Sequence, residues 1–156
     1  MNLKPVKTIK LLAPLMLLML ATENVLTTQP PPPRPALPNP VLVFTGQELF
    51  TEGKKQFVRY NYTVDNSASY PDELFAAAPD LPPCGKNTKS SRTWVDIYDQ
   101  SGKRLYGFCA LGKNKDLNKI WFALEQGAIP PSWVYIEMND RKTNTKYKSN
   151  LAETAL

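Results

Sequence analysis

The sequence predicts an all-β fold: a single antiparallel β-sandwich of about seven strands, immunoglobulin-like in pattern, with a short helical turn inside one long loop. Three observations support this prediction. Apolar and polar residues alternate in several short segments, as in strands with one buried face. Residues that favour turns separate these segments. The part from 41 to 151 has about 110 residues, which suits one domain with its own core.

The predicted strands cover residues 41–45, 56–65, 93–99, 104–111, 118–124, 132–139 and 144–150. Segment 56–65 has the clearest alternation, and the residues on its apolar face are Val58, Tyr60, Tyr62 and Val64. The loop Gln100-Ser101-Gly102 separates two of the strands and places glycine where a left-handed residue is needed. We therefore expect a hairpin there.

One connection, 66–92, is long for a sandwich. Within it, 72–78 combines helix-forming residues with acidic residues in a first turn, so it predicts one or two helical turns that the following prolines end. Loops of this length are often functional or held against the domain.

The carboxyl-terminal part adds a resemblance. It contains Trp121-Phe122-Ala123-Leu124, then Ile129-Pro130-Pro131-Ser132-Trp133-Val134-Tyr135-Ile136, then a polar turn and Lys146-Tyr147-Lys148-Ser149-Asn150. This order resembles the last strands of immunoglobulin-like or fibronectin type III-like sandwiches, where a proline-containing corner leads into a strand that bears a tyrosine. The resemblance implies a fold and no activity, because this architecture has unrelated functions.

The first 21 residues predict a signal peptide or an N-terminal signal anchor. Three lysines precede the apolar run Leu11–Ala21, which would be roughly 16 Å long as a helix, against about 30 Å for the hydrocarbon core of a bilayer. We therefore expect an exported protein that is periplasmic, at the cell surface or secreted. It would contact a membrane only if this segment is not cleaved.

Residues 22–40 form a proline-rich linker, and 152–156 are expected to be a disordered tail. The tract from Pro30 to Pro40 favours polyproline II, at about 3.1 Å per residue, and would act as a semi-rigid spacer. A second interpretation is that the tract is a ligand for an aromatic groove.

The formal charge of +5 does not indicate nucleic acid. Three of the positive charges come from Lys4, Lys7 and Lys10, and acidic residues are interleaved with most of the other basic clusters. We expect a solvated surface, with binding to an anionic surface or polysaccharide as the alternative.

The two cysteines, Cys84 and Cys109, predict one disulfide in an exported domain. The bridge would stabilise the fold by about 3 kcal/mol on the chain-entropy estimate. It would hold the long loop against the sheet. A pair of free buried thiols is the alternative if the chain is not exported.

The chain contains no histidine, which excludes Ser-His-Asp and Cys-His catalysis and imidazole metal sites. No catalytic residue, metal ion or cofactor is predicted, and the protein is expected not to be an enzyme. The alternative is a small hydrolase that uses paired carboxylates, either Asp96 with Asp99 or Glu137 with Asp140.

Aromatic residues supply the only positive binding signal. The candidate ligand-binding residues lie on two strands, where they alternate with aliphatic residues: Trp94, Asp96, Tyr98, Trp133, Tyr135 and Glu137. If the aliphatic faces form the core, these side chains point outward and could bind a sugar or a protein. We favour the other interpretation, in which the aromatic residues are themselves the core. Tyr106 and Phe108 have the same ambiguity.

The leading hypothesis is an exported, non-enzymatic binding module whose partner is a protein or a glycan outside the cytoplasm. The first alternative is a structural or assembly component of the cell envelope. The hydrolase is the second alternative.

Overall fold

The computed structural model describes residues 36–83 and 91–154. The predicted signal segment 1–21, most of the proline-rich linker and Cys84 lie outside the described residues. Within the described part, no helix is both long and apolar enough to cross a membrane.

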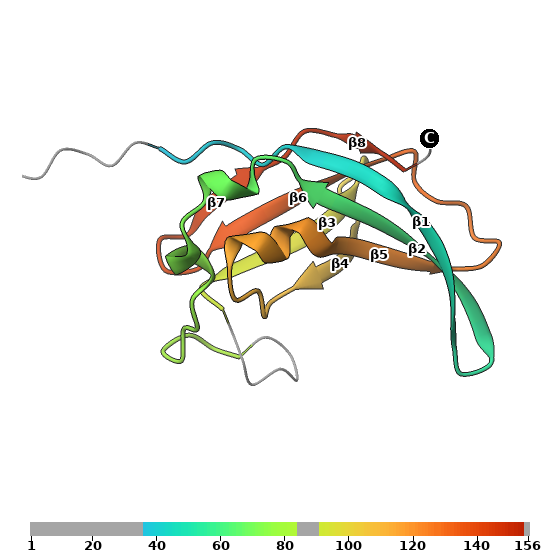
Figure 1. Ribbon diagram of the computed structural model, residues 1–156, viewed down its shortest axis with the longest axis horizontal. Helices are drawn as coiled ribbons and strands as arrows, with labels where there is room; N and C mark the ends of the chain where they lie inside the picture. The colour runs from blue at the N-terminus through green and yellow to red at the C-terminus, as the bar shows by residue number, and fades with distance from the viewer. Residues whose placement is uncertain (1–35, 84–90, 155–156) are drawn as a thin grey trace, which may run out of the picture. The chain divides into compact units, whose positions relative to one another are not determined.

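The described residues form two antiparallel sheets (Figure 1). One sheet has three strands in the order β1 (Leu42–Glu52), β2 (Lys55–Val64) and β5 (Ile120–Glu125). The other has the order β4 (Arg104–Phe108), β3 (Thr93–Asp99), β6 (Trp133–Asp140) and β7 (Thr145–Lys148), and the short β8 (Ala152–Glu153) also pairs with β6. The predicted all-β, antiparallel class is confirmed.

The two sheets bury their apolar faces in one core. The three-stranded sheet contributes alternate residues of β2 and β5, and the second sheet contributes alternate residues of β3 and β6: Tyr60, Tyr62, Val64, Ile120, Phe122, Val95, Ile97, Val134, Ile136 and Met138. Because each strand buries every second residue, the period of two in the sequence sets which side faces inward. Two sheets that share one core are compatible with a β-sandwich.

All seven predicted strands have an observed counterpart. The predicted hairpin joins β3 to β4, and Gly102 in its turn has a φ of 86°. Six of the seven strands differ from the prediction in their boundaries, several by only one or two residues. The first strand extends to Glu52, β4 ends at Phe108, and residues 118 and 119 belong to the 3-10 helix η3 (Asn114–Lys119) rather than to a strand.

The expected disordered tail differs from the structure at its start. Ala152 and Glu153 pair with Val134 and Trp133 as β8, and the side chain of Ala152 is buried. The backbone N–H of Thr154 then donates to the carbonyl of Ser132. A small apolar residue next to an unpaired edge of β6 is enough to add this short strand.

The described part of the long connection is held against the core. It forms two 3-10 helices, η1 (Ser67–Ser69) and η2 (Asp72–Phe75), so the predicted helical turn is present but shorter than expected. The buried side chains of this segment are Tyr70, Leu74, Phe75 and Ala78. The hydroxyl of Thr93 donates to the carbonyl of Leu74 at 2.6 Å, which connects the segment to β3.

The domain begins before residue 41. The hydroxyl of Tyr70 donates to the carbonyl of Pro38 at 2.7 Å, and the amide of Asn66 donates to the carbonyl of Asn39 at 2.9 Å. The side chain of Asn150 bonds to both backbone groups of Leu42. The last residues of the predicted linker therefore pack against the domain, at the start of β1.

Candidate binding site

A β-bulge in β1 decides which residues face the outer side of the three-stranded sheet. Phe44 pairs with Tyr62, but Gly46 pairs with Asn61, so Thr45 is an extra residue and the register shifts. One extra residue moves all later side chains of the strand to the opposite face. As a result, Glu48, Phe50 and Glu52 lie on the outer face, although the alternation before the bulge would have turned them inward.

Arg59 lies at the centre of this outer face. Its guanidinium carbon is 4.7 Å from the centre of the Phe50 ring and 4.8 Å from the centre of the Trp121 ring. One amino group donates to the carboxylate of Glu48 at 3.0 Å. The Nε atom of Arg59 is buried and has no hydrogen-bond partner among the described residues. Both contacts are cation–π contacts, which arginine makes readily because its guanidinium is planar and weakly hydrated.

Two aromatic residues of β4 complete the aromatic surface next to Arg59. The ring of Tyr106 stacks on Trp121, with 4.7 Å between centroids, and Phe108 contacts both rings edge-on. Tyr106 and Phe108 pair with the inward residues Ile97 and Val95. However, β4 is an edge strand, so their side chains reach over β5 instead of being enclosed in the core.

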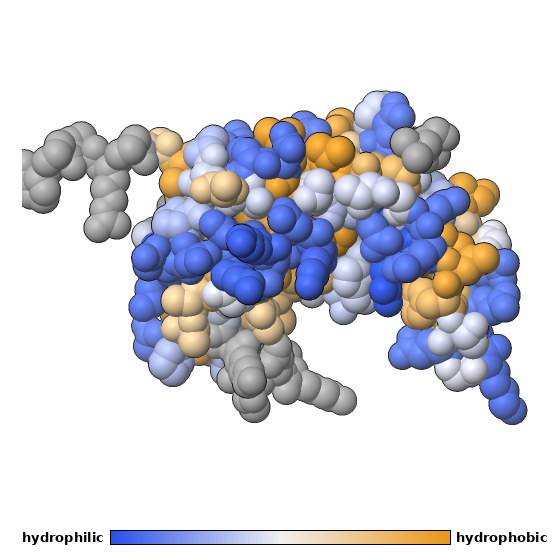
Figure 2. Space-filling model, viewed as in Figure 1, coloured by the Kyte–Doolittle hydropathy of each residue, from blue (hydrophilic) through white to orange (hydrophobic). Residues whose placement is uncertain are grey.

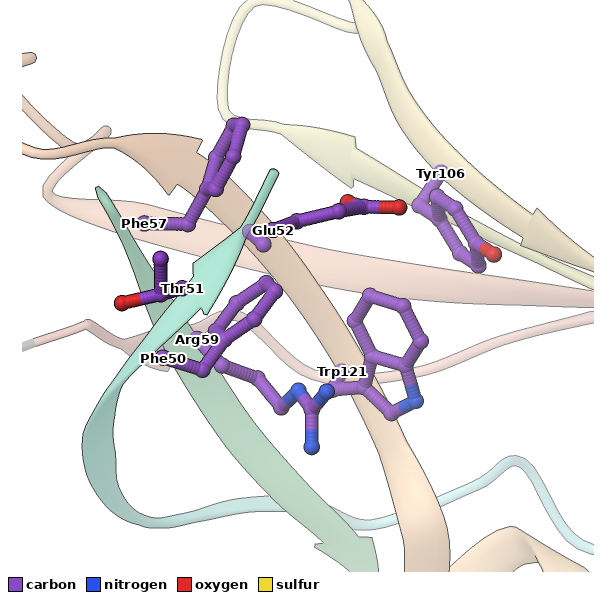
Figure 3. Close-up of a pocket in the computed structure, with 8 residues that line it drawn as sticks. Phe50, Thr51, Glu52, Phe57, Arg59, Tyr106 and Trp121 are labelled. Atoms are coloured by element: carbon purple, nitrogen blue, oxygen red, sulfur yellow. The ribbon is translucent and has the colours of Figure 1, made fainter. Parts of the chain in front are cut away.

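These groups surround a cavity of about 510 Å³, which we call the aromatic hollow. Its lining is Phe50, Thr51, Glu52, Phe57, Arg59, Tyr106, Trp121 and Ala123. Figure 3 shows the Arg59 guanidinium between the Phe50 and Trp121 rings, with the Glu52 side chain pointing across toward Tyr106. In Figure 2, apolar side chains gather where the β1–β2 hairpin leaves the sheet, and hydrophilic ones cover its tip.

Some carboxylates in and around the aromatic hollow form ion pairs, and one does not. Glu48 is paired with Arg59, and Glu125 on the neighbouring strand is paired with Lys55. Glu52 forms no ion pair with any described residue. Ala123 lies opposite Arg59 in the register, and its small side chain leaves the floor of the cavity open. The volume is within the range of ligand pockets, and the site offers flat aromatic rings, one arginine and one carboxylate, that of Glu52, without an ion pair among the described residues.

The sequence-predicted binding residues lie elsewhere, on the outer face of the five-stranded sheet. The interpretation that we favoured, in which the aromatic residues form the core, is wrong. The aliphatic residues of β3 and β6 are fully buried, whereas Trp94, Tyr98 and Tyr135 are only partly buried and Trp133 is 40% exposed. The inner faces of β3 and β6 are aliphatic, and the aromatic residues of this part of the core come from β2 and β5 instead: Tyr60, Tyr62 and Phe122.

The structure places all six predicted residues on one face of the sheet and pairs four of them across β3 and β6. Trp94 pairs with Asn139, Asp96 with Glu137, and Tyr98 with Tyr135, while Trp133 lies at the end of β6 beside β8. The Tyr98 and Tyr135 rings stack with centroids 5.3 Å apart.

The charged groups on this face have partners, whereas Trp94 Nε1 and Asn139 Oδ1 are buried and have none among the described residues. Arg104 binds Asp96 at 2.8 Å and Lys146 binds Glu137 at 2.8 Å, so opposite charges flank the two adjacent carboxylates. Glu137 also raises the pKa of the Lys146 ammonium, through a hydrogen bond and its charge.

The rings are covered by cations in the same way. The guanidinium of Arg141 lies 4.0 Å from the centre of the Trp94 ring, and the ammonium of Lys148 lies 4.1 Å from that of Tyr135. Both carboxylates of this face form ion pairs within the chain, and cations cover the Trp94 and Tyr135 rings. Glu52 of the aromatic hollow forms no ion pair with any described residue, so the hollow is the stronger candidate.

The other two carboxylates of the hydrolase hypothesis stabilise turns. Asp99 accepts hydrogen bonds from the backbone and hydroxyl of Ser101 and from the backbone of Lys103, and these bonds lower its pKa. The side chain of Asp140 is 3% exposed, and its two carboxylate oxygens accept hydrogen bonds from Nε and one amino group of Arg92. Among the described residues, no three His, Cys, Asp or Glu side chains lie close enough together to hold a metal ion.

The predicted Cys84–Cys109 bridge stays a prediction, because Cys84 lies outside the described residues. Ser91, the first described residue after that gap, donates its backbone N–H to the carbonyl of Cys109 at 3.1 Å.

Sequence reasoning missed the main residues of the aromatic hollow: Phe50, Phe57, Arg59 and Trp121. One signal was available. Trp121 is the aromatic residue on the polar side of a strand whose other side carries Ile120, Phe122 and Leu124. Its meeting with Arg59 depends on the pairing of β2 with β5, which a single sequence does not specify.

Comparison with known proteins found no family model that matches the chain, and no significant match among curated proteins or solved structures.

Proposed function

We propose that this chain is an exported, non-enzymatic binding module with an immunoglobulin-like sandwich fold, and that its ligand site is the aromatic hollow. One observation carries the proposal. The Arg59 guanidinium lies between the Phe50 and Trp121 rings, beside an open cavity that aromatic side chains line. Exposed aromatic surface next to polar groups marks ligand and partner sites more often than structural surface.

The strand order supports the immunoglobulin-like part of the proposal. In the constant-type sandwich, strands A, B, E and D form one sheet and C, F and G the other. In this chain, β1, β2 and β5 occupy the places of A, B and E, and β3, β6 and β7 those of C, F and G. The fourth strand, β4, pairs with β3 instead of joining the first sheet.

The proposal does not include the family's core tryptophan or corner tyrosine. Trp94 is on the third strand, but its side chain lies on the outer face under Arg141. Tyr135, the tyrosine after the proline corner, stacks on Tyr98. Only the arrangement of strands supports the family resemblance.

The export of the chain rests on its first 21 residues alone. An assembly role in the envelope is the second candidate, since the aromatic hollow could equally receive another protein subunit. For the hydrolase, the contacts of the four carboxylates offer no support, because each is occupied by an ion pair or a turn.

A binding screen with two matched variants tests the site. The protein is applied to a glycan array and to a peptide array, and every hit is repeated with Trp121→Ala and Trp133→Ala. We expect Trp121→Ala to weaken binding at least tenfold, as for a central aromatic contact, and Trp133→Ala to leave it within about twofold. Far-UV circular dichroism and thermal melting of both variants confirm that each is folded.

Two results would overturn the proposal. One is the absence of any hit above background on either array. The other is the reverse pattern, in which Trp133→Ala loses binding and Trp121→Ala keeps it. This pattern would assign the site to the outer face of the sheet that contains β3 and β6.

A further inference from the structure

The aromatic hollow has the features of a groove for polyproline II helices. Such grooves are lined by aromatic rings and bind a preformed extended helix whose carbonyl groups are free to accept hydrogen bonds. The aromatic hollow has two stacked ring pairs, Phe50 with Phe57 and Trp121 with Tyr106, at centroid distances of 5.5 and 4.7 Å. The guanidinium of Arg59 lies against one ring of each pair, Phe50 and Trp121.

The spacing of the two ring pairs suits this helix. Arg59 is 4.7 Å from the Phe50 ring and 4.8 Å from the Trp121 ring, so these rings are at most the sum of the two distances apart, roughly 9.5 Å. A polyproline II helix repeats after three residues, or about 9 Å. This repeat is within the upper limit, which is compatible with two prolines three positions apart contacting the two ring pairs at once.

The chain itself carries a matching segment. Residues 30–35 read Pro-Pro-Pro-Pro-Arg-Pro, so prolines recur three positions apart twice, and one arginine lies among them. Glu52 at the edge of the aromatic hollow forms no ion pair with any described residue. Arg34 would supply the missing positive charge.

The reach of the chain argues against binding of this segment in its own aromatic hollow. Pro38 and Asn39 are bound to Tyr70 and Asn66 at the start of β1. Phe50 lies eight residues after Leu42, about 27 Å away along the strand. Pro33 is five residues before Pro38, so even a fully extended chain carries it only roughly 18 Å from Pro38. Figure 1 shows that the chain enters β1 at the end opposite the β1–β2 turn.

We infer that residues 30–35 of one copy bind the aromatic hollow of a second copy, so that the protein associates head to tail. This inference rests on the proposed function, because it names the partner of the same site. The two surfaces are different and complementary, so the contact is heterologous and can continue from copy to copy.

A mixing experiment tests the inference by sedimentation velocity of the full chain. One variant, Trp121→Ala, removes the site and keeps the segment. The other replaces Pro30, Pro31, Pro32 and Pro33 by Ala, which removes the segment and keeps the site. We expect the wild type to associate with rising concentration and each variant alone to associate at least tenfold more weakly. An equimolar mixture of the two should form 1:1 dimers and nothing larger, because only one contact can be made.

A charge exchange covers the case in which Trp121→Ala does not fold. Glu52→Arg and Arg34→Glu should each weaken association, and mixing the two should restore it. Glu153→Arg, on β8 of the other sheet, is the matched control and should associate like the wild type. Because every variant keeps residues 11–21, association through that apolar run would be common to all samples and would not respond to mixing.

The inference is overturned if the proline variant associates like the wild type, if mixing restores nothing, or if the wild type stays monomeric at about 1 mM, the weak limit of specific binding. These failures are distinct from failure of the proposed function. One combination of results would support the site and reject this partner. In it, Trp121→Ala loses the array hits, but the proline variant associates like the wild type. The aromatic hollow would then bind a different ligand, such as a glycan.

Discussion

Two buried tyrosines differ in what their hydroxyl groups contact. The Tyr70 hydroxyl donates to the carbonyl of Pro38, whereas the Tyr62 hydroxyl is buried and has no partner among the described residues. Burial raises the pKa of both phenols, that of Tyr70 to about 12. Both side chains are about 1% exposed, so they form a matched pair for testing what a buried hydroxyl contributes.

We expect Tyr70→Phe to lower the free energy of unfolding by about 1 kcal/mol, because it leaves the Pro38 carbonyl without its donor. Tyr62→Phe should be neutral or slightly stabilising, because it removes a buried polar group that bonds to nothing in the described structure. Urea denaturation of both variants at pH 7 measures the difference. A loss of more than about 1 kcal/mol in Tyr62→Phe would mean that its hydroxyl has a partner, such as a buried water.

Asp140 predicts a dependence of stability on pH. Burial raises the pKa of Asp140. Hydrogen bonds from Arg92, Thr143 and the backbone of Lys142 lower this pKa by more than burial raises it, so the net shift is downward. The unfolded chain therefore binds the proton more tightly than the folded chain. The stability that Asp140 contributes is present above its unfolded pKa of about 4 and is lost as the pH falls through the folded value.

Asp140→Asn should lower the free energy of unfolding by about 2–3 kcal/mol at pH 7, because Arg92 loses a charged, hydrogen-bonded partner. The gap from the wild type should stay constant above about pH 5 and shrink below about pH 4. Asp80→Asn is the control, since Asp80 is an exposed residue paired with Lys142 at 3.5 Å and should change stability by under about 0.5 kcal/mol. A gap that does not change with pH would contradict this account.

At the scale of elements, β1 has the largest effect on the candidate site. Gly46, at the bulge, has a φ of 136°, a conformation that L side chains rarely adopt. A Cβ atom added there would have no heavy atom within 4 Å, so space is not the constraint. Glycine is needed for the backbone conformation that turns Glu48 and Phe50 to the outer face.

Gly46→Ala should therefore destabilise the protein by about 1–3 kcal/mol, through backbone strain. It should also weaken any ligand of the aromatic hollow, because Phe50 is placed by this bulge. Gly53→Asn is the matched control, since Gly53 has a φ of 64° in the hairpin turn, where asparagine is tolerated. Equal stability of Gly46→Ala and the wild type, measured by thermal melting, would show that the bulge does not need glycine.

The alternation of single strands was predictable from the sequence, but the length of β1 was not. The pattern of alternate apolar residues stops at Thr45 and Gly46, where the bulge changes its phase. The predicted strand rests on the β-branched and aromatic run Val41–Thr45 alone and ends there. The signal that was missed is local: Gly53 and Lys54 form a two-residue turn between Glu52 and Lys55, which is the hairpin connection that such a glycine favours.

At the scale of the whole molecule, export and the disulfide are linked, because a bridge persists only in an oxidising compartment. We expect the mass of the protein under non-reducing conditions to show loss of the first 21 residues and one bridge between Cys84 and Cys109. Cys109→Ser should then lower the free energy of unfolding by about 3 kcal/mol. A full-length, reduced species would contradict both expectations.

The sequence by itself determined the β class, the strands and which face of each strand is apolar, because these depend on a local period of two residues. It also determined the proline tract and the absence of histidine chemistry. Only the tertiary structure decided that the aliphatic faces of β3 and β6 form the core and that the sequence-predicted aromatic residues lie outside. It alone brought Phe50, Arg59, Tyr106 and Trp121 from four strands to one place. These outcomes depend on strand pairing and register, which join residues far apart in the chain and leave no local trace in the sequence.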